Sequence, residues 1–307
     1  MKIRKIVIGG LLVIIGLPVL LVVTAAVSVY VLNWTNGTLV SSGRKREYLL
    51  YVPKSYDRTK STPLVISMHG AGVWPAQQMN LSGWNRVADE HGFIVVYPSG
   101  TGVPRHWGSG AANVRFISEL IDTVEAAYNI DPTRIYANGF SNGGEMAFVL
   151  SCELSDRVAA VGTVAPALLD ASTWCTDSRP MPLISFHGTA DPLAPYDGGT
   201  SLASPPRFIA GKSVPFESVS TWNAYWARRN RCGPNPVESR VAADVTRLEY
   251  TDCADDAAVV LYTIKGGGHS WPGGKPMAEW WVGPTSRSID ASSLMWAFFR
   301  EHRLSRR

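Results

Sequence analysis

The chain has 307 residues, of which 46% are hydrophobic and 18% are charged, and its formal net charge is +4. This length is ample for one sizeable globular domain, and no low-complexity run or internal repeat interrupts the sequence. Three of the positive charges, on Lys2, Arg4 and Lys5, precede residue 6. The remainder is nearly neutral, so the sequence gives no reason to expect a nucleic-acid partner.

An uncharged stretch covers residues 6–32. As a helix it would be about 40 Å long, against a hydrocarbon core of about 30 Å. Secretory hydrophobic regions run only about 7–15 residues, so we expect residues 1–33 to form a membrane-spanning signal anchor, with a cleaved signal peptide as the alternative. The basic residues before the stretch then leave residues 34–307 outside the cytoplasm, either anchored to the membrane or secreted.

Short apolar runs alternate with helical patterns in the rest of the chain. The runs predict strands at residues 48–52, 64–68, 93–97, 134–137, 158–164, 183–186 and 259–264. The helical patterns cover residues 76–91, 113–128, 142–152, 216–231 and 290–302. Several runs are β-branched with little polar alternation, which is typical of strands buried on both faces of a parallel sheet. We therefore expect one doubly wound α/β domain over residues 34–307, with its ligands beyond the carboxyl ends of the strands.

The first chemical motif follows the run at 134–137. Residues 139–144 read GFSNGG and lead into a helical pattern. This is Gly-x-Ser-x-Gly in a strand–turn–helix context, where the flanking glycines allow a tight turn that exposes the serine beside a helix N-terminus. The motif predicts Ser141 as a nucleophile, and this context disfavours the alternative of a plain glycine-rich turn.

A serine nucleophile needs a base, and histidine is the usual one because it titrates near neutral pH. His187, His269 and His302 follow Ser141 in the chain. His269 lies in the glycine-rich loop GGGHSWPGG directly after a predicted strand, so we expect it to be the base. His187 leaves little room for an acid before it, and His302 belongs to a basic tail.

The acid that orients the base must lie between Ser141 and His269 on this kind of fold. Asp191 stands on the turn directly after the predicted strand at 183–186 and is the predicted acid. Asp197 is near it in the chain, but its position before two glycines suits turn capping better.

Acyl transfer also needs donors for the oxyanion. The backbone N–H of Asn142, the residue after the nucleophile, is the first expected donor, and the second comes from a loop after an early strand. That loop reads HGAG over residues 69–72. We predict Ala71 as the second donor, with Gly70 as the alternative, and expect His69 to support the loop rather than to carry a proton.

Four cysteines are present, namely Cys152, Cys175, Cys232 and Cys253. An even number in an exported domain favours disulfides. Of the three possible connectivities we favour Cys152–Cys175 and Cys232–Cys253, because each closes a short loop of about twenty residues. No Cys-x-x-Cys or Cys-x-x-His spacing occurs, so neither a zinc site nor any other metal or cofactor is expected.

Three tryptophans lie in loops that should border the site. They are Trp74 after the HGAG loop, Trp107, and Trp271 close to His269. Each is a candidate for binding the substrate through its ring, and packing of the loops is the alternative role for each.

Six segments carry a resemblance to a known family, namely HGAG (69–72), WNRVAD (84–89), GFIVVYP (92–98), GFSNGG (139–144), HGTADP (187–192) and GHSWPG (268–273). In this order they resemble the polyhydroxybutyrate depolymerase and feruloyl esterase family, close to the LpqC-like esterases, from about residue 37 to 300. The resemblance implies an α/β-hydrolase fold and a secreted enzyme for esters of hydroxyalkanoates, hydroxycinnamates or acetylated polysaccharide. It places the catalytic triad at Ser141, Asp191 and His269 and supports the Cys232–Cys253 bridge.

The chain departs from that family in its long apolar N-terminal stretch and in having no appended polymer-binding module. Soluble or short esters are therefore expected as substrates, rather than a crystalline polyester. We expect a monomeric, extracytoplasmic serine esterase that works through an acyl-enzyme. A cell-envelope acyltransferase and a serine peptidase would use the same triad, whereas a non-catalytic envelope-binding protein would have no need of all three groups.

Overall fold

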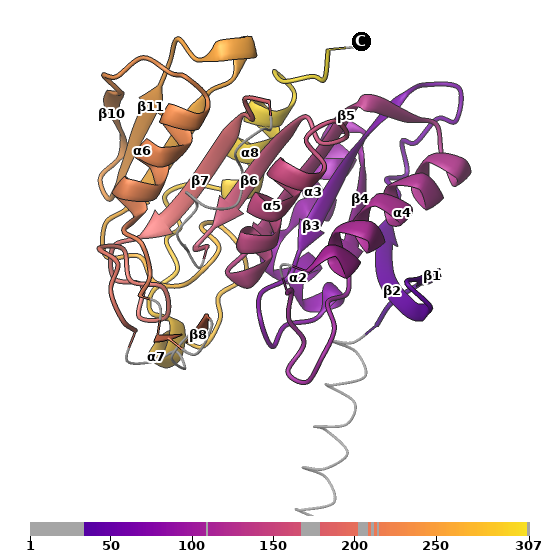
Figure 1. Ribbon diagram of the computed structural model, residues 1–307, viewed down its shortest axis with the longest axis horizontal. Coiled ribbons are helices and arrows are strands. Elements are labelled where there is room, and N and C mark those ends of the chain that lie inside the picture. Colours follow the sequence, from indigo (N-terminus) through magenta and orange to yellow (C-terminus); the bar gives the residue numbers. More distant parts are fainter. Residues whose placement is uncertain are drawn as a thin grey trace, which may run out of the picture. The chain divides into compact units, whose positions relative to one another are not determined.

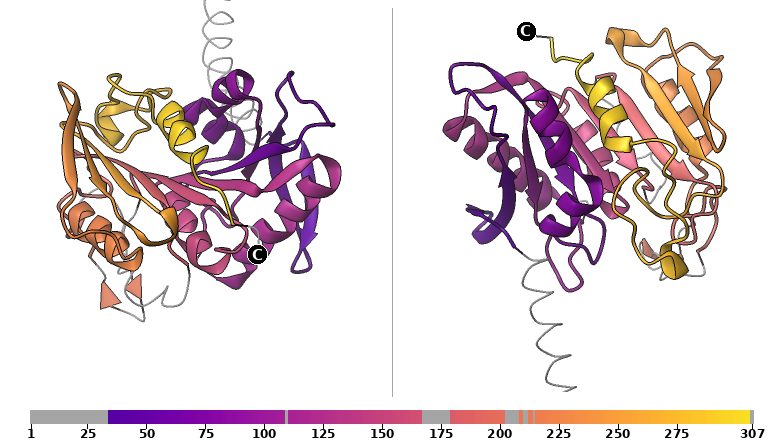
Figure 2. Two further views of the ribbon diagram at one scale, coloured as in Figure 1. Left: turned by 90° about the horizontal axis from the view of Figure 1, so that it is seen from above. Right: turned by 180° about the vertical axis from the view of Figure 1, so that it is seen from behind.

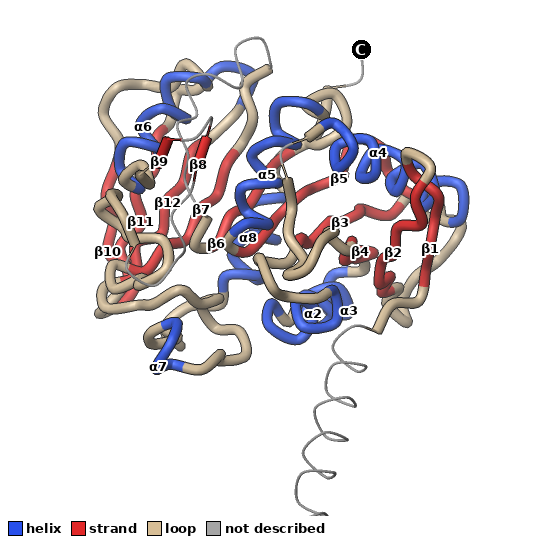
Figure 3. The backbone as a smooth tube through the Cα atoms, turned by 60° about the horizontal axis from the view of Figure 1, so that its bottom comes forward, coloured by secondary structure: helices blue, strands red, loops and turns tan. Residues whose placement is uncertain are grey.

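The computed structural model describes residues 34–108, 110–166, 179–201, 208–209, 212–213 and 215–305. Thr35–Arg307 form one compact unit, which is built on a ten-stranded sheet (Figure 1). The strands follow the order β1-β2-β4-β3-β5-β6-β7-β12-β11-β10, a row that Figure 3 shows in red. Two short strands, β8 (Phe208–Ile209) and β9 (Lys212–Ser213), pair with each other outside this sheet.

Parallel strands form the centre of the sheet. In spatial order they are β4 (Ile94–Pro98), β3 (Thr62–Met68), β5 (Ile130–Phe140), β6 (Ala160–Val164), β7 (Leu183–Gly188) and β12 (Val259–Ile264). Every residue of β3, β4, β6 and β7 is buried, because both faces are covered and neither needs polar side chains. Antiparallel strands extend the two edges, namely β1 (Gly37–Ser41), β2 (Arg44–Tyr51), β11 (Val245–Tyr250) and β10 (Val237–Ala242).

Helices cover both faces of the sheet, as the view from above shows (Figure 2). One face packs against α4 (Ala111–Ala127), α5 (Asn142–Glu153) and α6 (Val219–Arg229). The other face packs against α2 (Pro75–Ser82), α3 (Trp84–His91) and α8 (Ala291–Phe299).

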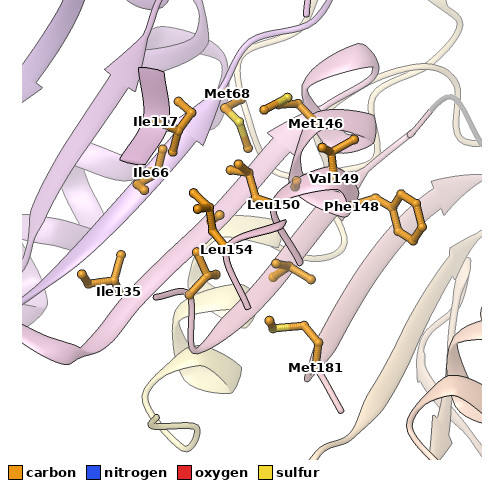
Figure 4. Packing of buried hydrophobic residues seen from close by; sticks show 14 of the residues in the cluster. Ile66, Met68, Ile117, Ile135, Met146, Phe148, Val149, Leu150, Leu154 and Met181 are labelled. Carbon is orange, nitrogen blue, oxygen red and sulfur yellow. The ribbon is translucent and has the colours of Figure 1, made fainter. Parts of the chain in front are cut away.

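The side chains of each strand alternate between these two cores. On β3, Ile66 and Met68 point into the first core, where Met146 and Leu150 of α5 meet them (Figure 4), while Val65 points into the second. This packing fixes α5, and with it the turn that precedes α5, against the carboxyl end of the sheet.

The predicted α/β architecture is confirmed, and each predicted strand overlaps an observed one. The single helix expected at 76–91 is wrong. Gly83 adopts a φ of 66°, ends α2 by donating its N–H to Met79 O, and lets α3 begin at Trp84. The strands β1, β10 and β11 and the short pair β8 and β9 were not predicted. β1 and β10 carry exposed residues, and β11 mixes charged residues with apolar ones, so none of these three has the apolar run of a central strand.

The predicted Cys232–Cys253 disulfide is present and joins the segment after α6 to the segment after β11. Cys175 lies outside the described residues, so the Cys152–Cys175 bridge stays a prediction. The apolar stretch at residues 6–32 also lies outside them, and the helices that are described include none with the length and apolarity to cross a bilayer. A short helix, α7 (Glu279–Val282), and a 3-10 turn (Ala254–Asp256) complete the described helices.

Candidate active site

The turn between β5 and α5 holds Ser141 in a constrained conformation. Its φ is 53°, a value that non-glycine residues adopt rarely, and its N–H donates to Val164 O on the neighbouring strand. A Cβ on Gly139 would collide with the backbone of Gly143, and a Cβ on Gly143 would collide with Met68 O. The glycines of the Gly-x-Ser-x-Gly motif are therefore required by the close approach of the backbone, as predicted.

The HGAG loop lies directly against this turn. A Cβ on Gly70 would come within 3.2 Å of Ser141 Cβ. Neither the N–H of Ala71 nor the N–H of Asn142 has a hydrogen-bond partner within the described parts of the chain. Asn142 opens α5, where the first N–H groups have no intrahelical acceptor. Two unused donors thus lie on the loop and the turn that flank Ser141.

His69 supports this loop from inside. Its Nε2 accepts the N–H of Gly100 at 2.9 Å, so Nδ1 carries the proton and donates to Gly70 O at 2.7 Å. Burial lowers the pKa of His69 to about 4, and the charge of Arg105 adds to that shift against the opposing hydrogen bond to Gly70. The imidazole is therefore neutral at physiological pH, and both of its nitrogens are already used.

Asp191 and His269 meet where β7 and β12 end. The two strands pair in parallel, with Gly188 opposite Ile264, so the loops that follow them start side by side. Backbone bonds join these loops, because Thr189 N donates to Ile264 O and Ala190 N donates to Gly267 O, each at 2.9 Å. His269 Nδ1 then lies 2.8 Å from Asp191 Oδ2.

The Asp191 carboxylate is fully buried and fully hydrogen-bonded. Its Oδ1 accepts the backbone N–H groups of Leu193 and Ala194, each at 2.8 Å. Burial by itself raises the pKa of this carboxyl. The positive charge of His269 and hydrogen bonds from His187 and His269 outweigh burial and hold the pKa well below its usual range. Asp191 is therefore ionised throughout the physiological range.

A pocket of ≈ 520 Å³ opens at this point. Its lining includes Ser141, His269, Ala71 and Asn142, so the predicted nucleophile, base and oxyanion donors face one space. Apolar side chains form much of the wall, namely Val73, Phe140, Leu193, Phe216, Met277, Trp281 and Val282. Besides Ser141, Asn142 and His269, the polar side chains on the lining are Gln77, His106 and Glu145.

None of the three tryptophans expected to bind substrate lines this pocket. Trp107 is buried and donates from Nε1 to His69 O, while its backbone bonds twice to the Asn142 side chain. Trp271 is fully buried and donates to Ser292 Oγ in the second core. Trp74 is half-buried at the start of α2. In the structure, Trp107 fixes the turn that bears Ser141 and Trp271 packs the core.

Two features of the site were not predicted from the sequence. His187, which its place in the chain disfavours as the base, contacts Asp191 Oδ2 at 3.3 Å. Trp281 lines the pocket from α7. This helix is bonded to the loop that bears His269, because His269 N donates to Val282 O. The HGTADP motif indicates that His187 lies near Asp191, because His187 stands at the end of β7 and Asp191 follows four residues later on the turn after the same strand. No group of three or more His, Cys, Asp or Glu residues in the described ranges could hold a metal ion.

Comparison with known proteins shows similarity to esterases. The family model described as "Putative esterase" matches residues 40–254. The putative esterase NocK of Nocardia uniformis subsp. tsuyamanensis is 31% identical over 275 residues, which are 83% of this chain and 79% of NocK. Feruloyl esterase B of Piromyces equi is 30% identical over 241 residues, 75% of this chain but only 44% of that longer enzyme.

Among solved structures, the acetyl xylan esterase from Aspergillus awamori matches with a TM-score of 0.56 and 13% identity. The match covers 76% of this chain and 93% of that enzyme, and at this identity it supports the fold alone. The family model and NocK together cover most of the described domain. The chain therefore belongs to the esterase family of α/β-hydrolases and is a carboxylic ester hydrolase.

Proposed function

We propose that the protein hydrolyses its ester through an acyl-enzyme, with Ser141 as nucleophile, His269 as general base and Asp191 as the acid that orients the base. The observation that carries this proposal is the 2.8 Å contact between His269 Nδ1 and Asp191 Oδ2, beside a pocket that both His269 and Ser141 line. A carboxylate only accepts, so the imidazole carries its proton on Nδ1 and keeps a lone pair on Nε2 for the serine.

The steps follow from these positions. His269 Nε2 takes the hydroxyl proton of Ser141 while Oγ attacks the ester carbonyl carbon. The oxyanion that forms accepts hydrogen bonds from the N–H groups of Ala71 and Asn142. The tetrahedral intermediate then expels the alcohol, which takes the proton from His269. A water molecule repeats the sequence on the acyl-enzyme, releases the carboxylic acid and restores Ser141.

The ionised Asp191 supports this cycle at the moment when His269 is a cation. Its two backbone hydrogen bonds hold the carboxylate in one orientation, and burial keeps water away from the ion pair. Most of the electrostatic stabilisation of the His269 cation is therefore in place before the reaction begins, as electrostatic catalysis requires.

The lining of the pocket favours substrates whose acyl group is apolar or aromatic, and we propose hydroxycinnamoyl esters as the first candidates. Phe140, Met277 and Trp281 offer ring and thioether surface that an aromatic acyl group can contact. The relative from Piromyces equi is named a feruloyl esterase, and the fold match from Aspergillus awamori is named an acetyl xylan esterase. Acetyl esters and hydroxyalkanoate oligomers are the further substrates that we propose, and the LpqC-like subtype stays a prediction.

We also propose that the domain works outside the cytoplasm. The Cys232–Cys253 disulfide supports this, because such bonds persist in oxidising compartments. The basic residues before the apolar stretch at 6–32 predict the same orientation. The N-terminal residue of the mature protein would show whether this stretch anchors the enzyme or is removed.

The nucleophile is tested by Ser141→Ala in the full-length protein, with Ser239→Ala on the exposed strand β10 as the matched control. We expect Ser141→Ala to lower kcat on p-nitrophenyl butyrate by at least about 10⁴-fold. Ser239→Ala should keep the activity, and both variants should keep the wild-type melting temperature. A folded Ser141→Ala variant with wild-type turnover would refute the proposal.

The substrate is tested by kcat/KM on methyl ferulate, acetylated xylan, hydroxybutyrate oligomers and short alkyl esters under one set of conditions. We expect methyl ferulate to be among the best substrates. Adding glycerol or a sugar distinguishes hydrolysis from transfer, because an acyltransferase would give mainly the new ester instead of the free acid. Equal rates on all esters would contradict the proposed role of the apolar wall.

A further inference from the structure

A second buried histidine contacts the acid of the proposed triad. His187 Nε2 lies 3.3 Å from Asp191 Oδ2, the same oxygen that accepts the proton of His269 Nδ1 at 2.8 Å. The side chains of His187 and Asp191 are 1% and 0% exposed. His187 does not line the pocket, so it cannot touch the substrate. It can affect the reaction only through the residues that it contacts, among them Asp191 and Ala194.

The hydrogen bonds of His187 define its tautomer. Nε2 lies 2.8 Å from Ala194 O, and a carbonyl oxygen only accepts, so Nε2 carries the proton. This one N–H is shared between Ala194 O, the closer acceptor, and Asp191 Oδ2. Nδ1 is buried and has no hydrogen-bond partner among the described residues.

The same N–H closes a small network around the acid. Asp191 Oδ1 accepts the N–H groups of Leu193 and Ala194, and Ala194 returns its carbonyl to His187. Tyr196 packs edge-on against the His187 ring, with the ring centroids 5.9 Å apart. Each oxygen of the Asp191 carboxylate thus has two contacts, and the end of β7 is bonded to the turn that bears the acid.

We propose that His187 is a positioning residue for the proposed triad, which donates from Nε2 to keep the Asp191 turn in the geometry that orients His269. This inference rests on the proposed function. In this role His187 acts as a hydrogen-bond donor and not as a base or nucleophile, because its donor nitrogen faces Ala194 O and Asp191 rather than the pocket.

Two neutral variants test the position of the donor. The amide nitrogen of His187→Gln reaches about as far as Nε2, whereas that of His187→Asn reaches only about as far as Nδ1. In the full-length protein on p-nitrophenyl butyrate, we expect His187→Asn to lower kcat by about 10- to 100-fold, the effect of losing a hydrogen bond to a charged group, with little change in KM. His187→Gln should stay within about threefold of wild type.

A double-mutant cycle separates positioning from packing. In an Asp191→Asn background the carboxylate is gone, so His187→Asn should lower kcat by less than about threefold further. A packing role would instead lower kcat by the same factor in both backgrounds. The melting temperature of each variant shows that it is folded, and His187→Gln decides the matter if His187→Asn does not fold.

The inference and the proposed function fail separately. Activity that survives Ser141→Ala refutes the proposed function, whatever the His187 variants do. With Ser141-dependent activity established, wild-type kcat in a folded His187→Asn variant would overturn the role of His187. An equal loss in folded His187→Asn and His187→Gln variants would also overturn it, because the position of the donor would then be irrelevant.

Discussion

Replacing Asp191 with Asn tests the site at its most constrained point. The amide oxygen of the variant must face the N–H groups of Leu193 and Ala194, which the wild-type Oδ1 accepts at 2.8 Å. The amide NH₂ then faces His269 Nδ1, which must become an acceptor. The imidazole proton moves to Nε2, on the side where Ser141 needs a lone pair. The variant would therefore hold the base in the wrong tautomer without disturbing the shape of the site.

The expected loss is about 10⁴-fold in kcat, the size known for such a tautomer change in a serine triad. It corresponds to about 5 kcal/mol of transition-state stabilisation. KM should change little, because Asp191 does not line the pocket. The assay is steady-state hydrolysis of p-nitrophenyl butyrate by protein whose melting temperature shows that it is folded.

Asp197→Asn is the matched control, since Asp197 is an exposed turn residue six positions further along. It should keep wild-type kcat. A folded Asp191→Asn variant within tenfold of wild type would refute the assignment of Asp191 and the tautomer reasoning together. A large loss in Asp197→Asn instead would identify that residue as the acid.

Two further predictions concern the pocket wall and the buried charge. Trp281→Ala should lower kcat/KM on methyl ferulate by about tenfold, the scale of one lost aromatic contact, and should affect methyl acetate far less. Trp280→Ala is the control, because Trp280 is more exposed and lies outside the lining. Equal effects of the two variants on methyl ferulate would contradict the reasoning. Because the folded pKa of Asp191 lies below its unfolded value, the charged carboxylate stabilises the fold above about pH 4, and this contribution is lost as the pH falls further. Urea unfolding should therefore show a shallower loss of stability between pH 5 and 3 in Asp191→Asn than in wild type, and identical slopes would contradict it.

The parts of the fold that sequence predicts best are those where burial leaves a local pattern. The apolar runs of β3, β4 and β7 are readable because helices cover both of their faces. The edge strand β10 carries exposed charges such as Glu238, and its neighbour β11 mixes charged residues such as Arg247 with apolar ones, so no apolar run marks either strand. Gly83 ends a helix through its φ of 66°, which a helical pattern by itself does not reveal.

The residues of the site likewise divide into those that the sequence predicts and those that it does not. Ser141, Asp191 and His269 each come just after a strand, and the carboxyl ends of parallel strands meet at one edge, so chain order suffices to bring them together. No such rule predicts whether a loop side chain points into the core or into the pocket. Trp271 is two residues from His269, the proposed base, yet is fully buried, whereas Trp281 is ten residues further on and lines the pocket.

The turn that bears Asp191, the proposed acid, links the proposed catalysis to the shape of the pocket. Leu193 and Ala194 donate their N–H groups to Asp191, and the same two residues line the space in front of Ser141. A substitution that enlarges the pocket at Leu193 therefore risks moving the carboxylate that orients His269. Trp281 reaches the pocket from α7, where Val282 O accepts the backbone N–H of His269. Specificity can therefore be changed at Trp281 with less effect on kcat than at Leu193.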